Sequence, residues 1–349
     1  MRPISTSTPL PSSGMSTSSL QAANGDATTA TDEDRVKTSE VLSLDSIRAT
    51  LIRQEETIIF ALIERAQYRQ NQAVYIKKDN LGSPPGSTVP EGLENEPLSF
   101  MEYLLIGTEA LHYAVRRYTS PEETPFFPDR LPNEKVMMEL DYPELLSSIG
   151  GASDVNFNEI LMKKYLEVTV PSIAVPGDDE QYGSTVLCDV AVLQAISKRV
   201  HFGKFVAESK YLADPEGYQR LVDAGDSDGV MALLTNSVVE EKVLRRARLK
   251  AATYGREPLL ANMPAFETSK ENTSIVAAAA AAAVVGAIEA MGADADAGHD
   301  KISPSTVESV YRDIIIPLTK DIEVAYLFLR CGKQPPSQFA PDRMSIDEL

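Results

Sequence analysis

Apolar residues recur at helical spacing along most of the chain, and no stretch of convincing length alternates apolar and polar residues as a strand would. The first clear helical pattern follows Ser43 and Asp45, either of which can cap a helix, and it continues to Arg69. Pro317 is expected to kink or divide the last helix. Further helices are expected over residues 99–118, 156–168, 184–210, 214–224, 228–234, 236–254 and 305–330. The chain is therefore expected to be all-α, as a single large helical-bundle domain.

Three segments depart from this pattern and set the expected boundaries. Residues 1–42 are dominated by Ser and Thr, which predicts a disordered leader. Residues 256–301 contain seven consecutive alanines and an acidic Gly/Ala/Asp tract, which predicts an Ala-rich surface insertion. Its apolar run is too short to span a bilayer. Residues 331–349 are expected to form a flexible C-terminal tail, so the helical domain is expected to span residues 43–330.

Composition narrows the classes of partner. The chain has 33 basic and 51 acidic residues and a net charge of −18, which disfavours nucleic acid and anionic membrane surfaces as partners. Two cysteines, Cys188 and Cys331, make no disulfide framework and fit a reducing compartment. The three histidines are scattered, so no metal site is expected. A cytoplasmic location is expected, with a plastid as the alternative because residues 1–25 contain one arginine and no acidic residue.

The segment SKRVHFGKFVAESK, residues 197–210, carries the most informative polar pattern. Along a helix, Arg199 and Lys210 are eleven residues apart and project from one face, about 16 Å apart at the backbone. Gly203 and Val206 lie between them and leave a low apolar floor. Such a face would suit a small molecule with two separated anionic groups. The alternative is an ordinary solvated helix face.

Other polar pairs are weaker when taken alone. Asn236 and Glu240 share a helix face, as do Thr319 and Glu323, and Arg48 lies in the first turn of its helix. Each pair is more often a cap or a solvated pair than a site. The proline-containing segment over residues 120–128 is not compatible with regular helix and is expected to be a fixed turn.

Long segments of the chain resemble the eukaryotic-type, all-helical chorismate mutases of fungi and plants. The resembling segments are SIRATLIRQEETIIFALIERA, RRYTSPEETPFFPD, YGSTVLCD, LQAISKRVHFGKFVAESK, TNSVVEEKV and IIPLTKDIEVAYL. The resemblance implies an isomerase that rearranges chorismate to prephenate on the route to phenylalanine and tyrosine. It also implies a homodimer that uses no cofactor, and an intramolecular pericyclic reaction that requires no nucleophile.

The resemblance assigns roles to single residues. It makes Arg48 and Arg199 the partners of the two carboxylates of chorismate. Lys210 would donate to the ether oxygen and a carboxylate, and Glu323 would face the other side of that ether oxygen.

Three further residues complete the implied substrate site. Glu240 would receive the ring hydroxyl, and Asn236 and Thr319 would hold the side-chain carboxylate. One departure lies nearby, because Ala325 stands where the family usually has a glutamate. Helical spacing places it at an outward or supporting position.

The resemblance also implies feedback control by tryptophan, tyrosine or phenylalanine at the dimer interface. The implied effector-binding residues are Arg116 and Arg117 of one subunit and Gly183 and Ser184 of the other. Ser184 is expected to cap the long helix, and a helix N-terminus beside two arginines suits an amino-acid carboxylate. Leu187 and the acidic loop before Gly183 differ from the fungal pattern, which leaves the identity of the effector open.

Two other classes of function compete with this interpretation. The first is a catalytically silent regulatory homologue on the same helical scaffold, which loss of Arg48, Arg199, Lys210 or Glu323 would favour; all four are present. The second is an acidic helical scaffold of unrelated function, which would make the seven matched positions a coincidence.

Overall fold

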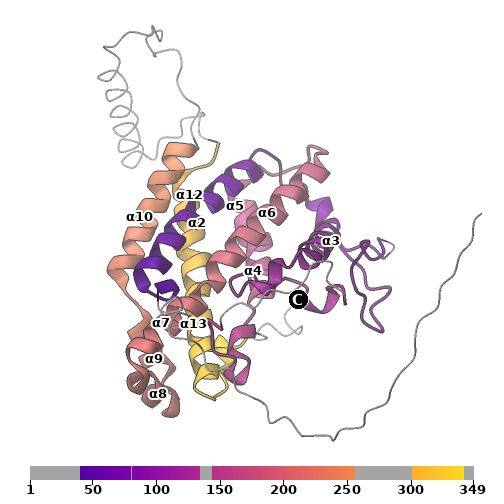
Figure 1. The fold of residues 1–349 in the computed structure, drawn as a ribbon. Helices are drawn as coiled ribbons and strands as arrows, with labels where there is room; N and C mark the ends of the chain where they lie inside the picture. The colour runs from indigo at the N-terminus through magenta and orange to yellow at the C-terminus, as the bar shows by residue number, and fades with distance from the viewer. Residues whose placement is uncertain (1–39, 80, 134–143, 256–300, 342–349) are drawn as a thin grey trace, which may run out of the picture.

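The computed structural model of this chain describes residues 40–79, 81–133, 144–255 and 301–341. These residues form helices joined by 3-10 and π turns, with one isolated antiparallel bridge between Lys78 and Leu98. The prediction of an all-α fold is confirmed. The α-helices are α2 (Leu44–Arg65), α3 (Phe100–Ala114), α4 (Asn158–Lys164), α5 (Val170–Ile173), α6 (Tyr182–His201), α7 (Gly203–Ala213), α8 (Pro215–Asp223), α9 (Ser227–Leu234), α10 (Ser237–Tyr254), α12 (Pro304–Val310) and α13 (Ile316–Arg330) (Figure 1).

Several helices begin where the sequence supplies a side-chain acceptor. Ser43 caps α2, and its hydroxyl accepts the N–H of Ser46 at 3.3 Å. Ser99 and Glu102 form a reciprocal capping box at the start of α3. Asn236 caps α10, which ends at Gly255 as the sequence predicts. These caps satisfy backbone N–H groups that have no partner inside a helix.

Two predicted helices end or begin elsewhere. The helix α3 stops at Ala114, and Arg116 has a left-handed backbone with φ of 66°, so Arg116 and Arg117 do not lie in a last helical turn. The helix α6 begins at Tyr182 after Gln181, which makes no side-chain cap. Ser184 therefore lies inside the first turn of α6 and is not its cap.

The predicted continuous helix over residues 184–210 is divided. The helix α6 ends at His201, Phe202 forms a turn, and α7 begins at Gly203. The last helix is divided as predicted, with a π turn over Tyr311–Ile315 between α12 and α13. Pro317 falls in the first turn of α13, where its missing N–H costs little.

The buried apolar residues form two clusters, and α13 runs through both. The larger cluster contains residues of α2, α4, α6, α12 and the first half of α13, up to Ile322, together with Ala325. The smaller cluster contains Phe202, Phe205, residues of α8 and α9, and the other buried apolar residues of α13 from Val324 to Phe328. The boundary between the two clusters passes through the Arg199–Gly203 turn and the Glu323 turn of α13, which places polar side chains between two apolar cores.

Part of the predicted leader and tail belongs to the folded domain. Leu42 and Phe339 are both buried in the smaller cluster, so the expected boundaries at residues 42 and 331 are too narrow. Ala325 is fully buried in the larger cluster and is not an outward position. Residues 1–39, most of the Ala-rich insertion and residues 342–349 lie outside the described residues. None of the helices within the described ranges is long and apolar enough to span a bilayer.

Gly203 marks the closest approach of α7 to α13. A Cβ atom at this position would lie 2.9 Å from the Thr319 carbonyl oxygen, 3.1 Å from Thr319 Cγ2 and 3.3 Å from Glu323 Cγ. We expect Gly203→Ala to lower the free energy of unfolding by about 1–3 kcal/mol, because backbone and side chain must both move. The control is Gly183→Ala in α6, where nothing lies within 4 Å. It should raise the free energy of unfolding by up to about 1 kcal/mol. Urea unfolding measures both, and equal effects would contradict the proposed contact.

The two ends of the segment over residues 256–300 meet in the folded domain. The N–H of Lys301 donates to the Gly255 carbonyl at 2.8 Å. We therefore expect deletion of residues 273–298 to change the free energy of unfolding by less than about 1 kcal/mol, because loop-closure entropy varies slowly with loop length. A larger loss in urea unfolding would show that the deleted residues pack on the domain.

Candidate active site

Arg199 lies near the end of α6 and is almost fully buried, with 6% of its surface exposed. Its Nε and Nη1 groups have no hydrogen-bond partner among the described residues. Burial lowers the pKa of Arg199, and the nearby Tyr311, Glu55 and Glu323 oppose that change. Because buried N–H donors without partners are costly, these two nitrogens are suited to donate to an anionic group.

Glu323 faces this region from α13. Its Oε2 lies 3.9 Å from Lys210 Nζ, which also donates to the Leu234 carbonyl at 2.5 Å. Burial raises the pKa of Glu323 to about 7, and the positive charges of Lys210 and Arg199 limit the rise. Near neutral pH a sizeable fraction of this carboxyl is protonated and able to donate a hydrogen bond. Arg199, Lys210 and Glu323 therefore make a site with two cations and one neutralisable acid.

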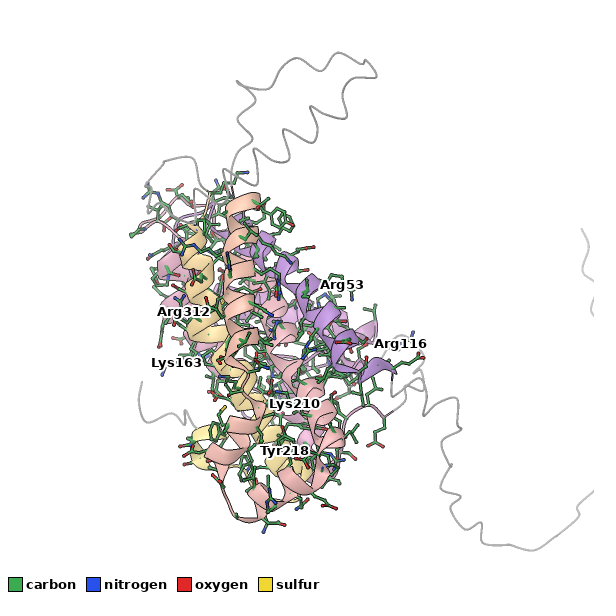
Figure 2. The ribbon with its side chains drawn as sticks, turned by 90° about the vertical axis from the view of Figure 1, so that its left-hand side faces the viewer. Arg53, Arg116, Lys163, Lys210, Tyr218 and Arg312 are labelled. Carbon is green, nitrogen blue, oxygen red and sulfur yellow. The ribbon has the colours of Figure 1, made fainter. Side chains whose placement is uncertain are left out.

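A tyrosine that the sequence analysis did not single out lies close to this acid. Burial, with the charge of Glu323 as the next cause, raises the pKa of Tyr218 to about 12. Figure 2 shows Lys210 and Tyr218 in the same lower part of the molecule. Tyr218 comes from α8, so a fourth helix borders the site.

Gly203 of α7 and Thr319 of α13 lie at the contact between these two helices. The Thr319 hydroxyl donates to the Ile315 carbonyl at 2.6 Å, one turn earlier in the same helix stack. Its oxygen can then only accept a further hydrogen bond from a ligand or an adjacent donor. Gly203 has no side chain to separate the two helices, so the Thr319–Glu323 turn lies directly against α7.

An ion pair joins the start of α10 to α13, and a side-chain cap begins α10. Glu240 pairs with Lys320 of α13 at 2.7 Å. The Asn236 side-chain oxygen accepts the N–H of Val239 at 3.1 Å and is committed to the cap. The structure thus brings Glu240 to the helix that carries Thr319 and Glu323, and Asn236 to the same edge of α10.

Arg48 is the predicted site residue that stands apart. Its side chain is 53% exposed and pairs with Asp45 at 3.2 Å. Within the described residues, no hydrogen bond or ion pair joins Arg48 to Arg199, Lys210 or Glu323. An exposed pair of this kind contributes at most about 1 kcal/mol, so Arg48 can exchange Asp45 for another anion at little cost.

A charged cluster beside Arg199 escaped the sequence analysis. Glu55, which is 1% exposed, accepts from Arg246 at 2.7 and 2.5 Å and lies 3.3 Å from Lys250. The Tyr311 hydroxyl nearby has no hydrogen-bond partner among the described residues, and the same holds for the amide of Gln54. Glu55 follows Arg48 by two helical turns on one face, and Arg246 and Lys250 are one turn apart; that spacing is the available signal.

The four predicted effector-binding residues are not gathered within one chain. Arg117 contacts Gln194, which lies about 15 Å along α6 from Ser184. Gly183 and Ser184 lie in the first turn of α6, where backbone N–H groups lack helical partners. The two halves of the predicted site are thus separate in a single subunit.

The described residues form an all-helical domain with charged side chains gathered where two apolar cores meet. The family profile for type II chorismate mutases matches residues 182–324. Chorismate mutase 1, chloroplastic, from Arabidopsis thaliana is 38% identical over 344 residues, which cover 94% of this chain and 91% of that protein. The chorismate mutase of Schizosaccharomyces pombe is 39% identical, over 84% of this chain and 98% of that protein.

Solved structures of chorismate mutases are also similar to this chain. The crystal structure of a chorismate mutase from Candida albicans in complex with L-Trp has a TM-score of 0.67 and 34% identity, covering 87% of this chain and 97% of that one. The structure of AtCM1 with tyrosine bound in an allosteric site has a TM-score of 0.62 and 37% identity, covering 83% and 97%. This chain belongs to the chorismate mutase family, and its enzyme class is that of an isomerase.

Proposed function

We propose that this chain rearranges chorismate to prephenate at the site formed by α2, α7, α10, α13 and the end of α6. The observation that carries the proposal is the buried guanidinium of Arg199, whose Nε and Nη1 have no partner among the described residues, near Glu323, a carboxyl of raised pKa that lies 3.9 Å from Lys210. Chorismate is a dianion with an ether oxygen between its two reacting halves. The site offers separated cations for the carboxylates and donors for the oxygen.

The residues divide the substrate between them. Arg199 and Arg48 bind the two carboxylates, and Arg48 gives up its exposed pair with Asp45 to do so. Lys210 and Glu323 approach the ether oxygen from opposite sides.

The remaining polar groups hold the periphery of the substrate. Glu240 accepts the ring hydroxyl while it keeps its pair with Lys320. Asn236 and Thr319 steady the side-chain carboxylate, Asn236 through its amide N–H groups. The Thr319 hydroxyl must release the Ile315 carbonyl to donate to that carboxylate.

The rearrangement breaks a C–O bond and forms a C–C bond within one molecule, so positioning and electrostatics supply the rate. Fixing both carboxylates holds the compact diaxial conformer, in which the reacting carbons approach. Negative charge develops on the ether oxygen as its bond to carbon lengthens. Lys210 and protonated Glu323 donate to that oxygen, and a buried setting strengthens both interactions.

The active form is proposed to be a homodimer regulated by aromatic amino acids. Relatives of known structure bind L-Trp, and tyrosine or phenylalanine at an allosteric site. Arg116 and Arg117 of one subunit and Gly183 and Ser184 of the other are proposed as the effector-binding residues, which fits their separation within one chain. For location, cytoplasm is proposed; relatives from Arabidopsis thaliana and Petunia hybrida are named chloroplastic, so a plastid is the alternative.

The first test removes the buried cation. Arg199→Ala should lower kcat/KM for chorismate by about 100- to 1,000-fold, because a desolvated charge-assisted pair is lost. Its free energy of unfolding should not fall, since Nε and Nη1 of Arg199 have no hydrogen-bond partner among the described residues. Arg312→Ala is the control, because Arg312 is half exposed and pairs with Glu308. A folded Arg199→Ala protein with near-normal turnover would refute the role of Arg199, whereas a folded parent protein without turnover would favour the catalytically silent homologue.

The second test concerns pH. Only the acid form of Glu323 can donate to an ether oxygen, so activity should fall as pH rises through about 7. Glu323→Gln keeps a permanent donor and should hold its activity to higher pH. Folding raises the pKa of Glu323 from about 4.5 to about 7. Ionisation of its carboxyl therefore lowers the free energy of unfolding as pH rises through that range. Glu323→Gln lacks this ionisation, so between pH 4.5 and pH 8 its free energy of unfolding should rise by about 3 kcal/mol relative to that of the parent.

Glu308→Gln provides the matched control for this test, because Glu308 lies on α12 and pairs with Arg248 and Arg312 outside the site. It should leave the alkaline decline of the parent in place. An equal decline in Glu323→Gln, or an inactive but folded variant, would contradict a protonated Glu323.

A further inference from the structure

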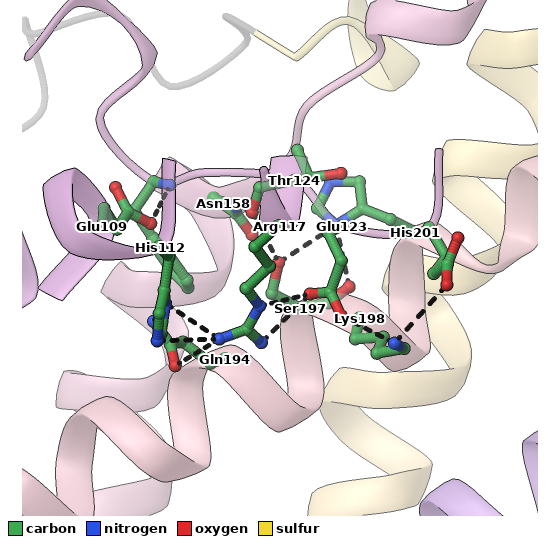
Figure 3. Close-up of polar contacts among 12 residues, drawn as sticks. Glu109, His112, Arg117, Glu123, Thr124, Asn158, Gln194, Ser197, Lys198 and His201 are labelled. Carbon is green, nitrogen blue, oxygen red and sulfur yellow. Dashed lines mark hydrogen bonds and ion pairs between the residues drawn. The ribbon is translucent and has the colours of Figure 1, made fainter. Parts of the chain in front are cut away.

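The Glu123 carboxylate joins Arg117, which follows α3, to Lys198 near the end of α6. Glu123 accepts from Lys198 Nζ at 2.6 Å through Oε1, and from Arg117 Nε at 3.1 Å through Oε2. Arg117 Nη2 also lies 3.0 Å from Oε2. The Glu123 side chain is only 12% exposed, so both pairs are shielded from screening by solvent. Figure 3 shows the carboxylate of Glu123 between the two cations.

The backbone around Glu123 is held in place. The N–H groups of Phe126 and Phe127 donate to Glu109 at 2.7 and 3.0 Å. The Asn158 amide donates to the carbonyls of Thr124 and Pro125 at 2.9 and 3.0 Å. Because the segment that follows Glu123 is held by α3 and α4, a change in the contacts of Glu123 is expected to move its partners, Arg117 and Lys198, more than the loop.

Arg117 has almost no donor to spare. Its Nε and Nη2 serve Glu123, and its Nη1 donates to His112 Nδ1 at 2.9 Å and to Gln194 Oε1 at 3.2 Å. A guanidinium has five N–H groups, and bidentate recognition of a carboxylate needs two that point the same way. A carboxylate ligand that takes Arg117 on its Nε/Nη2 edge must displace Glu123.

The other partner of Glu123 sits next to the catalytic arginine. Lys198 directly precedes Arg199, and the hydroxyl of Ser197 donates to the Thr124 carbonyl at 3.4 Å. Arg199 itself has no hydrogen bond at Nε or Nη1 within the described residues. Its position is therefore set by the turn that carries it, and that turn is held by Glu123 and Thr124.

We propose that Glu123 is a positioning residue that couples Arg117 to the Ser197–Arg199 turn, so that an amino-acid carboxylate competing for Arg117 changes turnover by releasing Glu123. This inference rests on the effector site under the proposed function. It goes further by naming the group that the effector displaces and the contact through which Arg199 responds.

The experiment compares Glu123→Gln with Glu122→Gln in the full-length protein. Glutamine keeps the size of the side chain but loses the charge that holds Arg117 and Lys198. Glu122 is the matched control, because it pairs with Lys198 at 3.7 Å and has no described contact with Arg117. Chorismate turnover is measured with and without tryptophan, tyrosine and phenylalanine, and binding of each amino acid is measured by calorimetry.

The wild type and Glu122→Gln should respond to at least one amino acid by about fivefold or more, in the usual range of allosteric coupling. Glu123→Gln should bind that amino acid as tightly or more tightly, because its competitor for Arg117 is gone. Its turnover should nevertheless change by less than about twofold. General damage to the fold would instead weaken binding, and thermal unfolding checks for it.

Two failures are distinguishable. If the wild type catalyses the rearrangement but neither binds nor responds to any of the three amino acids, the proposed effector site is wrong, and the coupling with it. If the wild type responds and Glu123→Gln responds equally, or binds the amino acid more weakly, the effector site stands and the role of Glu123 is overturned.

Discussion

The approach of α7 to α13 at Gly203 is the constraint on which the site depends. A side chain there would meet the Thr319 carbonyl at 2.9 Å, so the two helices can touch only because residue 203 is glycine. That contact places Glu323 of α13 within reach of Lys210 of α7. It also falls where the larger and smaller apolar clusters meet, so the polar groups have low-dielectric surroundings on both sides. Burial raises the pKa of Glu323 for the same reason.

Burying charged groups costs free energy, and ion pairs with neighbouring side chains offset part of that cost. Glu55 is buried beside Arg199, and Arg246 and Lys250 of α10 neutralise its charge. Lys320 does the same for Glu240. Arg199 retains unpartnered N–H groups, and leaving a buried donor unsatisfied costs about 1–3 kcal/mol. The unpartnered donors lower the free energy of unfolding, and a bound dianionic substrate would supply the missing hydrogen bonds. Such a trade-off is expected at a binding site.

Several helix starts and one shared helix face could be predicted from the sequence, because they depend only on residues close together in the chain. Ser43, Ser99 and Asn236 begin helices because each offers an acceptor to free backbone N–H groups. The face shared by Thr319 and Glu323 follows from helical periodicity alone. Arg199 and Lys210 were expected on one continuous helix, whereas a turn at Phe202 separates α6 from α7. Nothing in local propensity marks that turn.

The features that escaped prediction depend on distant parts of the chain. Glu55 and Arg246 are 191 residues apart in sequence, and no spacing rule pairs them. Helical spacing placed Ala325 at an outward or supporting position, but α13 is covered by two clusters and has hardly any outer face. The left-handed backbone of Arg116 is equally non-local, since the segment after it is fixed by Glu109 and Asn158.

Lys210 shows how a side chain can be tethered and still serve a substrate. The Leu234 carbonyl that accepts from it lies at the C-terminal end of α9, where carbonyls lack helical partners and the helix dipole favours a cation. An ammonium group has three N–H donors. One is used by Leu234, and Glu323 lies 3.9 Å away as an ion pair, so a donor remains for the proposed contact with the ether oxygen. The tether lowers the number of conformations that Lys210 must give up on binding, and in the proposed mechanism it holds the ammonium where charge would develop in the transition state.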